Sequence, residues 1–342
     1  MPGKDIGIDL GTSTITVYAK GKGILLHEKN ALAVDARTKE VLSVGNEAFA
    51  LLDRSPDTLE LCRPMRDGVI SDFSVMQQIL TMTLEKICGN GIFRPNVIIT
   101  APSGITALEK RTILSVAVRC GAGKVCLLDA PIASALGAGV SISKPHGVMV
   151  VDIGAGTADI ALITMGTVAY TSSLRTAGES MDEAIQRYLR RERSMLVGLP
   201  TAEKIKRLIG CAALRNEEVE LSVNGKDAIM EQPATFPVTS TEIYQALKEI
   251  VDQLIDGILA VLEETPPELY SDVCEEGILL TGGGSQLYGL DEAIESRLKI
   301  KVHTAYDGAH CAAKGAGYAL RYIKKLEDNG YVFRLKNVGK AE

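Results

Sequence analysis

The stretch Val148–Thr171 reads VMVVDIGAGTADIALITMGTVAYT and decides the fold of this 342-residue chain. A β-branched apolar run opens it and predicts a buried strand. The run breaks at Asp152–Thr157, and alternation then resumes as a second strand that turns at Gly166 and returns. A hairpin with glycines at its tip exposes backbone N–H groups that can surround a phosphate, because no Cβ blocks the anion. The carboxylate at the strand end stands where a phosphate-bound Mg²⁺ needs an oxygen ligand.

The same order of residues recurs near the N-terminus. Ile6–Thr14, IGIDLGTST, again has an apolar strand, then Asp, Gly and hydroxyl residues, and an alternating strand follows. One such turn is as often a structural hairpin as a phosphate loop. Two copies indicate a unit used twice, which is a statement about the fold. The sequence therefore predicts two related α/β domains with a nucleotide clamped between their hairpins.

Composition agrees with this interpretation. The length allows two domains and a sizeable core. A net charge of −6 lacks the excess of positive charge that is typical of nucleic-acid-binding proteins, so we expect no nucleic-acid partner. The 7 cysteines show no C-x-x-C spacing and predict reduced thiols of a cytoplasmic protein. The 4 scattered histidines argue against a metal cluster, and no apolar run is long enough to span a membrane.

Six further motifs are more specific than the two hairpins. In colinear order they are RPMRDGVISDF at 63–73, PSGIT at 102–106, AGESMD at 177–182, TAEKIK at 201–206, TPPEL at 265–269 and LTGGG at 280–284. The paired hairpins resemble the phosphate loops of the superfold that contains actin, the sugar kinases and the heat-shock chaperone ATPases. The six motifs resemble one group within it, the MreB family of bacterial actins with its Mbl-type paralogues, over roughly residues 6–320.

This resemblance implies two actin-like (ribonuclease H-like) α/β domains with mixed sheets flanked by helices. Domain I would comprise residues 1–143 and 315–342, with a small insert at about 33–66. Domain II would comprise residues 144–314, with an insert at about 183–238. The small residues of 312–318 predict either an interdomain hinge or close helix packing.

The resemblance also implies ATP and Mg²⁺ as ligands. Asp9 and Asp152 would hold the Mg²⁺ shell, largely through water, and with Thr157 would form the catalytic set. Glu203 and Lys206 would reach the ribose or the base, although their spacing alone is also that of a surface ion pair. The glycine run at 282–284 is expected at the base or diphosphate, with a purely structural turn as the alternative. The remaining expected nucleotide contacts are Gly11, Thr12, Ser13, Gly154, Ala155, Gly156, Gly178, Glu179, Gly282, Gly283 and Gly284.

The chain departs from the family pattern at Ala130. Relatives carry Glu immediately before Pro131, where it positions or activates the attacking water. A methyl group does neither, and loss of such a group costs 10²–10⁴ in rate. We therefore expect at most a slow ATPase, unless Asp129 or Thr157 substitutes through a shifted water. Ala155 also replaces a glycine that relatives often have, and is expected to stiffen the loop slightly.

The resemblance finally implies partners and a place in the cell. Ile92 and Phe93, in a Gly-rich loop, would insert into the membrane, and the alternative is that they fold into the core. The protein would form head-to-tail filaments, single or double, at the inner face of the cytoplasmic membrane. It would help determine rod cell shape with the cell-wall elongation proteins. The rivals are a nucleotide-binding regulator without filaments, a sugar-kinase-like phosphotransferase and a chaperone ATPase; the last would need a substrate domain that we do not expect here.

Overall fold

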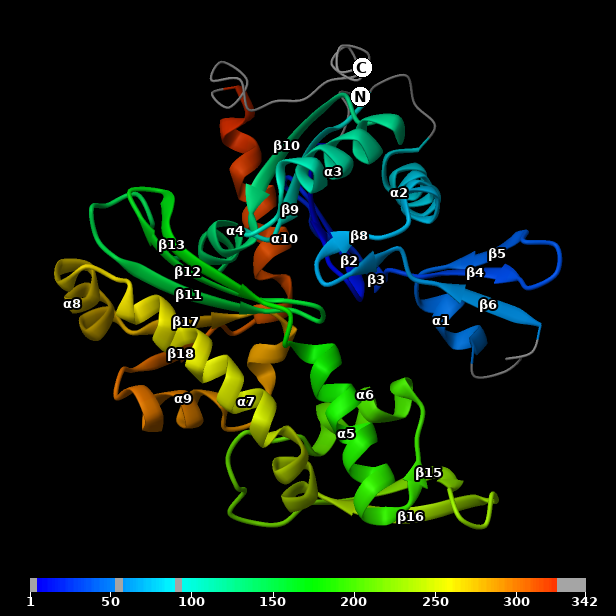
Figure 1. Cartoon of the computed structure of the whole chain (residues 1–342). Coiled ribbons are helices and arrows are strands. Elements are labelled where there is room, and N and C mark those ends of the chain that lie inside the picture. The colour runs from blue at the N-terminus through cyan, green and yellow to red at the C-terminus, as the bar shows by residue number, and fades with distance from the viewer. Residues whose placement is uncertain (1–4, 53–57, 90–93, 325–342) are drawn as a thin grey trace. The chain divides into compact units, whose positions relative to one another are not determined.

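The computed structural model describes residues 5–52, 58–89 and 94–324. It divides into two compact units, Met1–Ile142 with His310–Glu342 and Ser143–Ala309 (Figure 1). Each unit is built on a 5-stranded mixed sheet flanked by helices. The predicted actin-like α/β fold is thus present in both.

The first unit's sheet has the order β10-β9-β1-β2-β3. β1 pairs antiparallel with β2 and parallel with β9, as a hairpin followed by crossover connections requires. Its strands are β1 (Ile6–Leu10), β2 (Thr14–Ala19), β3 (Gly23–Lys29), β9 (Asn96–Ala101) and β10 (Lys124–Asp129).

The second unit's sheet has the order β13-β12-β11-β17-β18 and repeats the first strand by strand. Asp9 pairs with Thr16 across the first hairpin, and Asp152 pairs with Asp159 at the same place in the second. The prediction of one unit used twice is confirmed. The strands are β11 (Val148–Ile153), β12 (Ala158–Thr164), β13 (Thr167–Leu174), β17 (Ile278–Thr281) and β18 (Val302–Thr304).

The two faces of the first sheet are covered by different helices. One face packs against α2 (Phe73–Cys88) and α3 (Ala107–Arg119), which carry apolar residues at helical spacing. The other packs against α10 (Gly308–Ala319) and the 3₁₀ turn η2 (Leu320–Tyr322). The chain passes between the units at 309/310, so the small-residue helix lies in the first unit from His310 onward. The hinge and the close packing of this helix both stay predictions.

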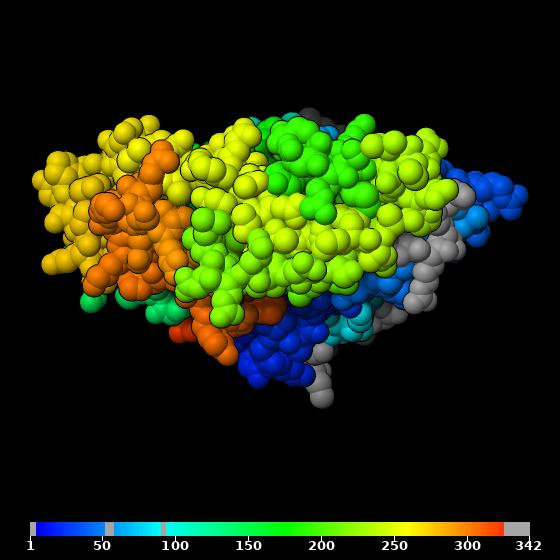
Figure 2. All heavy atoms as spheres, turned by 90° about the horizontal axis from the view of Figure 1, so that it is seen from below, coloured from blue at the N-terminus to red at the C-terminus, as the bar shows by residue number. Residues whose placement is uncertain are grey.

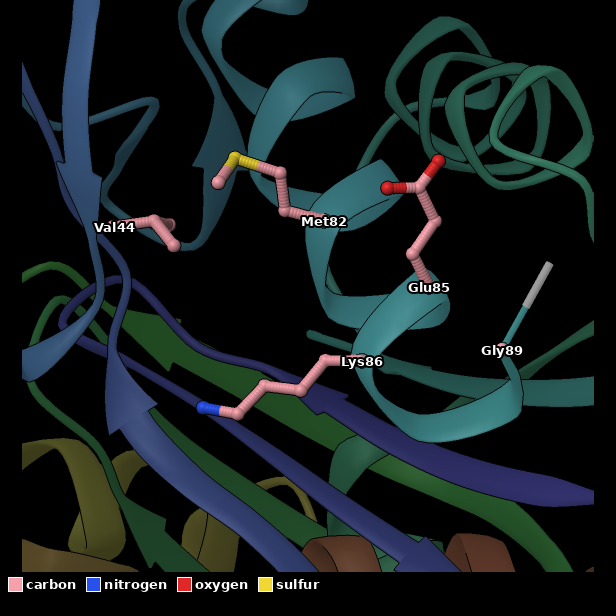
Figure 3. A pocket seen from close by; sticks show the side chains of 5 residues that line it. All are labelled: Val44, Met82, Glu85, Lys86 and Gly89. Atoms are coloured by element: carbon pink, nitrogen blue, oxygen red, sulfur yellow. The ribbon is translucent and has the colours of Figure 1, made fainter.

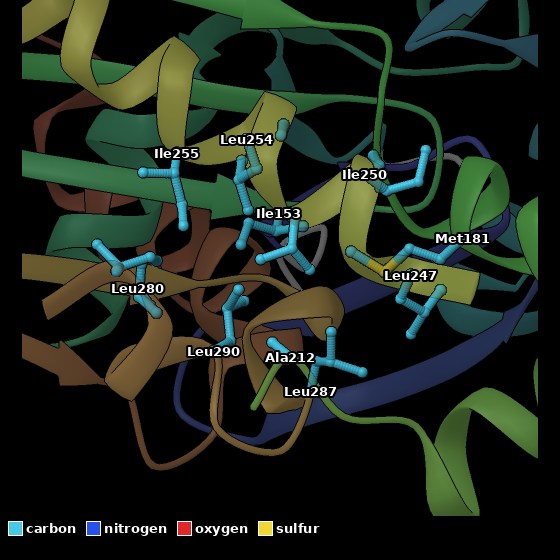
Figure 4. Close-up of a cluster of buried hydrophobic side chains, with 14 of the residues drawn as sticks. Ile153, Met181, Ala212, Leu247, Ile250, Leu254, Ile255, Leu280, Leu287 and Leu290 are labelled. Atoms are coloured by element: carbon cyan, nitrogen blue, oxygen red, sulfur yellow. The ribbon is translucent and has the colours of Figure 1, made fainter. Parts of the chain in front are cut away.

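The core of the second unit is organised by α7 (Ser240–Glu263). A capping box opens it: Thr239 and Glu242 satisfy each other's backbone N–H groups. Figure 4 shows Leu247, Ile250 and Leu254 of this helix converging with Ile153, the residue directly before the hairpin turn. α8 (Pro267–Glu276), η1 (Gly283–Gln286) and α9 (Leu290–Leu298) complete this part of the unit.

Each unit also carries a small inserted subdomain. The first has the sheet β5-β4-β6 with helix α1, followed by the short hairpin β7–β8. The second has two helices and the sheet β14-β15-β16, whose yellow-green residues reach the surface seen from below in Figure 2. Their bounds are β4 (Leu32–Asp35), β5 (Val41–Val44), α1 (Asn46–Leu52), β6 (Leu59–Cys62), β7 (Met65–Arg66), β8 (Val69–Ile70), α5 (Gly178–Arg193), β14 (Met195–Leu196), α6 (Leu199–Ile209), β15 (Glu220–Asp227) and β16 (Pro233–Thr239).

Some elements extend beyond the motifs and apolar residues that mark them. α6 begins at Leu199, before the TAEKIK motif, because Pro200 is accommodated in its first turn. β15 and β16 are longer than their apolar residues suggest, since an antiparallel sheet exposed on one face keeps polar residues there. The predicted membrane residues 92 and 93 and the tail beyond 324 lie outside the described residues.

Candidate functional site

In the first unit, the turn between β1 and β2 is held by side chains from neighbouring segments. The Gly11 N–H donates to the Thr14 carbonyl at 3.0 Å and closes the turn. Asn30, which is 1% exposed, donates its side-chain amide to the Gly11 carbonyl at 2.9 Å. The Thr12 hydroxyl accepts from the Gly68 N–H at 3.0 Å. Thr12, predicted to contact phosphate, therefore also braces the turn from within.

Asp9 lies at the end of β1, beside this turn. Burial raises the pKa of its carboxyl above the ordinary value, and two neighbours oppose that rise. The Thr100 hydroxyl donates to Asp9 Oδ1 at 2.6 Å, and the charge of a protonated His310 also favours the carboxylate. The His310 ring meets the His27 ring edge to face, with centroids 4.8 Å apart. His27 Nδ1 lies 2.9 Å from the Thr16 hydroxyl.

The faces of the first sheet decide which residues can act beside Asp9. Asp9 and Thr100 lie on the face that carries Ile98, which contacts α10. Asp129 lies two residues after Leu127, whose side chain packs on the opposite face against α2 and α3. There Asp129 interacts with Lys110 of α3, and burial raises the pKa of its carboxyl. Asp129 therefore faces away from Asp9, and its role in place of the Glu that the resemblance implies stays a prediction.

Ala130, at the position of that Glu, begins α4 (Ala130–Gly137), in which Pro131 occupies the first turn. Its methyl group gives this helix start no acid–base group. The expectation of slow hydrolysis stays a prediction.

In the second unit, the turn between β11 and β12 repeats the first. The Gly154 N–H donates to the Thr157 carbonyl at 2.8 Å. Here the support comes from backbone at the start of α5: the Gly178 N–H donates to the Gly154 carbonyl at 3.1 Å, and the Glu179 N–H donates to the Ala155 carbonyl at 2.8 Å. No positive φ angle occurs at residues 154–156, so Ala155 fits without strain.

The Thr157 side chain has a partner of its own. Its hydroxyl donates to Asp159 Oδ2 at 3.1 Å, and Asp159 is 3% exposed. The second hairpin therefore places two oxygen-bearing side chains, Thr157 and Asp159, together at the β12 side of its turn. The sequence analysis missed Asp159, although its pairing opposite Asp152 follows from the register of the hairpin.

The three glycines after β17 differ in what surrounds them. A Cβ on Gly282 would lie 2.5 Å from Asp152 Oδ1, and its φ angle is 78°. A Cβ on Gly284 would lie 2.3 Å from the Ile153 side chain. A Cβ on Gly283 would meet no heavy atom within 4 Å in the described part of the chain. Gly282 and Gly284 thus allow close packing on β11, whereas Gly283 leaves open space beside it.

Lys206 of α6 points at the start of α5. Its ammonium lies 2.8 Å from Asp182 Oδ1 and donates to the Gly178 carbonyl at 2.7 Å. Burial raises the pKa of Asp182 to about 6, against the opposing effect of Lys206. Lys206 thus ties α6 to the backbone that supports the second hairpin. Glu203 lies one turn earlier on the same helix and is half-buried.

Comparison with known proteins agrees with this geometry. The family model described as MreB/Mbl protein matches residues 3–328. The chain belongs to the MreB/Mbl family. It is 40% identical to cell shape-determining protein Mbl of Bacillus subtilis, covering 94% of this chain and 97% of that protein. It is also 40% identical to cell shape-determining protein MreB of Escherichia coli, covering 93% of this chain and 94% of that protein.

Solved structures place this MreB/Mbl family member in the actin-like fold. MreB5 of Spiroplasma citri bound to AMPPNP superposes with a TM-score of 0.91 at 30% identity, covering 96% of this chain and 99% of that one. The same protein bound to ADP gives the same values. The MamK double helical filament matches with a TM-score of 0.81 at 23% identity, which supports the fold alone.

Several polar residues of this family member were not predicted from the sequence. Asn30, Thr100 and Asp182 lie far along the chain from the hairpins that they support, so no local pattern marked them. His27 and His310 likewise come from opposite ends of the chain. No helix in the described residues is long and apolar enough to cross a membrane.

Proposed function

We propose that this protein is an ATP-binding bacterial actin that polymerises head to tail into filaments at a membrane and contributes to cell shape. The observation that carries the proposal is the repeated Asp-turn hairpin, present once in each of two units of the same topology. Its support includes the family membership and a relative at 30% identity that binds AMPPNP and ADP. Nucleotide contact with both hairpins would favour one arrangement of the units over others.

Each half-site contributes groups suited to a nucleotide. The Gly11 and Gly154 turns would contact phosphates through backbone N–H groups, together with Ser13 and Gly156. Gly283 offers the open backbone surface for a base or diphosphate. We propose that Glu203 contacts the ribose and that Lys206 acts by holding Gly178, given its bonds there.

Mg²⁺ fits the residues present. Asp9 and Asp152 end equivalent strands, and carboxylate oxygens are ligands that Mg²⁺ prefers. The Thr281 hydroxyl, paired in register with Asp152, is fully buried and has no hydrogen-bond partner among the described residues. It could bind a water of the ion's shell. An ion held by these two carboxylates, largely through water, would neutralise phosphate charge.

We propose that hydrolysis is slow. Ala130 supplies no group to orient or deprotonate water, and Asp129 lies on the other face of the sheet. The nucleotide would then act mainly as a ligand that favours assembly, and filaments would turn over slowly. This feature also favours the second candidate, a nucleotide-binding regulator that does not assemble.

We propose a peripheral position at the inner face of the cytoplasmic membrane, next to the cell-wall elongation machinery. The support is the apolar pair Ile92–Phe93 in a Gly-rich loop and the relatives named as cell shape-determining proteins. Two apolar side chains bind lipid weakly, so many copies in a filament are needed for stable attachment.

The test is co-sedimentation with ATP, ADP or no nucleotide, with and without anionic liposomes. We expect ATP to drive ordered filaments into the pellet, and liposomes to increase the pelleted fraction. I92D/F93D should abolish the liposome effect alone, whereas M165D, at a turn where Met165 is 67% exposed, should not. A protein that stays monomeric in all conditions but binds ATP would instead be a regulator.

A further inference from the structure

The ammonium group of Lys29, the last residue of β3, lies at the turn between β1 and β2. Its Nζ donates to Ser13 Oγ at 3.5 Å. It also lies over the ring of Phe49 on α1, 4.8 Å from the ring centroid, where an aromatic face attracts a cation. Neither a hydroxyl group nor a phenyl ring carries a formal negative charge, so these two contacts position the ammonium without neutralising it.

The strand register places Lys29 on the same face of the first sheet as Asp9. Asp9 pairs with Thr16 of β2, and Thr16 pairs with His27 of β3. Side chains directly opposite each other on antiparallel strands share a face, and so does the residue two places further along a strand. Lys29 is two residues after His27, and its own partner is Thr14. Asp9 and Lys29 thus stand on one face of the sheet, at the end where the turn lies.

The acidic residue next to Lys29 in the sequence lies on the opposite face. Glu28 pairs with Ile15, whose side chain belongs to the core that α2 and α3 cover. Lys86 of α2 donates to Glu28 Oε1 at 2.5 Å. Figure 3 shows the Lys86 side chain extending away from Glu85, its neighbour on the helix. Glu28 is therefore engaged by Lys86 and not by the ammonium of Lys29.

The backbone around Lys29 is fixed by hydrogen bonds. The Lys29 N–H donates to Asn46 Oδ1 at 3.0 Å. The next N–H, that of Asn30, donates to the Ser13 carbonyl at 2.9 Å, and the Asn30 side chain donates to the Gly11 carbonyl at 2.9 Å. The end of β3 is thus joined to the turn at two of its residues. An ammonium carried by such a backbone loses less conformational freedom when it binds a ligand.

We propose that Lys29 is a phosphate-binding residue of the first half-site and supplies a positive charge for the phosphates of the nucleotide. This rests on the proposed function, in which Ser13 contacts a phosphate. A phosphate oxygen at the Ser13 hydroxyl would come within reach of an ammonium that lies 3.5 Å from that hydroxyl. An ammonium offers three donors, and its hydrogen bonds to an anion are about twice as strong as those between neutral groups. Lys29 would therefore favour phosphorylated ligands over a bare nucleoside.

The test compares variants that remove the charge with one that keeps it. K29M keeps most of the side-chain length without the charge, K29Q is a second neutral variant, and K29R keeps the charge. The matched control is K22M, at the exposed turn that joins the other ends of β2 and β3. In calorimetric titrations with ATP and Mg²⁺, we expect affinities at least tenfold weaker for K29M and K29Q. K29R should stay within about threefold of the wild type, and K22M within about twofold.

Titration with adenosine separates phosphate binding from a structural role. Adenosine has no phosphate, so its affinity should change less than twofold in every variant, and urea unfolding checks that each variant folds. If K29M and K29Q bind ATP as tightly as the wild type, this inference is overturned while nucleotide binding stands. Equal losses of ATP and adenosine affinity would also overturn it, because Lys29 would then support the turn and not bind phosphate. A wild-type chain that binds no ATP overturns the proposed function as well.

Discussion

The hairpins β1–β2 and β11–β12 have the same turn but different supports. The bond that closes the turn, from the Gly11 or Gly154 N–H, measures 3.0 Å in one and 2.8 Å in the other. The first is braced by the side chains of Thr12 and Asn30. The second is braced by backbone N–H groups at the start of α5. An inherited turn therefore keeps its backbone while its surroundings diverge, and the two hairpins should respond differently to substitution.

Their surroundings differ in chemistry as well. The first hairpin stands beside Asp9, Thr100 and two histidine rings. In the same unit, α4 follows β10 directly and begins with Ala130. The second stands beside Thr157 and Asp159, and is linked through Gly178 to the ion pair of Asp182 and Lys206. Titratable groups thus lie beside both hairpins: Asp9 and the two histidines at the first, and Asp159, Asp182 and Lys206 at the second or its supports.

The largest expected effect comes from placing a carboxylate at position 130, in the unit of the first hairpin. We expect A130E to raise the rate of phosphate release by 10²–10⁴, because a positioned acid–base group contributes that much. Single-turnover phosphate release measures it. A130Q, which has the same shape without a base, should remain slow, and D129N should match the wild type because Asp129 faces α3. An A130E protein that binds ATP and releases phosphate no faster than the wild type would contradict the assignment of this position.

The next effect concerns the strand behind the first turn. Gly7 occupies the place that Val150 has in the second sheet, and a Cβ there would lie 2.3 Å from the Gly317 backbone nitrogen of α10. We expect G7A to lower the free energy of unfolding by about 3 kcal/mol, since backbone must shift. Urea unfolding measures the loss. G198A is the control, because its Cβ would be 3.6 Å from Pro200 and unstrained. Equal stability of the two variants would mean that the α10 backbone shifts at little cost in free energy.

What the sequence predicted was the part that local pattern controls. The two hairpins followed from alternation interrupted by Asp-x-Gly.

What it did not predict depends on contacts between distant segments. Asp182 and Lys206 form a buried ion pair that no periodicity marks, and Asn30 reaches Gly11 across a strand and a turn. The glycine run illustrates the same limit. Gly282 and Gly284 are needed for packing on β11, and only the structure separates them from Gly283.

The ion pair behind the second hairpin predicts a dependence of stability on pH. Burial raises the native pKa of Asp182 to about 6, above its unfolded value of 3.8, so the native state holds the proton more tightly. The stabilisation from this proton is present below pH 4 and is lost as the pH rises to about 6. We expect a loss of about 2 to 3 kcal/mol attributable to this group.

Urea unfolding of the wild type and D182N between pH 4 and pH 7 isolates this contribution. The amide does not titrate, so the stability of D182N relative to the wild type should improve as the pH rises through this window. D256N, at an exposed site on α7 with its own Arg297 partner, controls for loss of an acidic residue. If the unfolding free energies of wild type and D182N changed with pH in parallel, Lys206 would fully offset the burial of Asp182.

The smallest expected effect tests the second turn itself. Ala155 has no positive φ angle, and its carbonyl already accepts from Glu179, so a glycine is not required there. We expect A155G to leave ATP affinity within about twofold and to lower stability by about 0.5 to 1 kcal/mol through the freer unfolded chain.

The neighbouring position gives the contrast. A Cβ on Gly154 would lie 3.2 Å from the Thr157 carbonyl oxygen, within the closed turn. G154A should therefore weaken ATP binding more than A155G does, in the same fluorescence titration. If A155G instead raised affinity tenfold, the Ala155 methyl would be an obstacle to the phosphate, and the second hairpin would be the weaker of the two half-sites. The turn's backbone would then have been kept while its ligand contact was reduced.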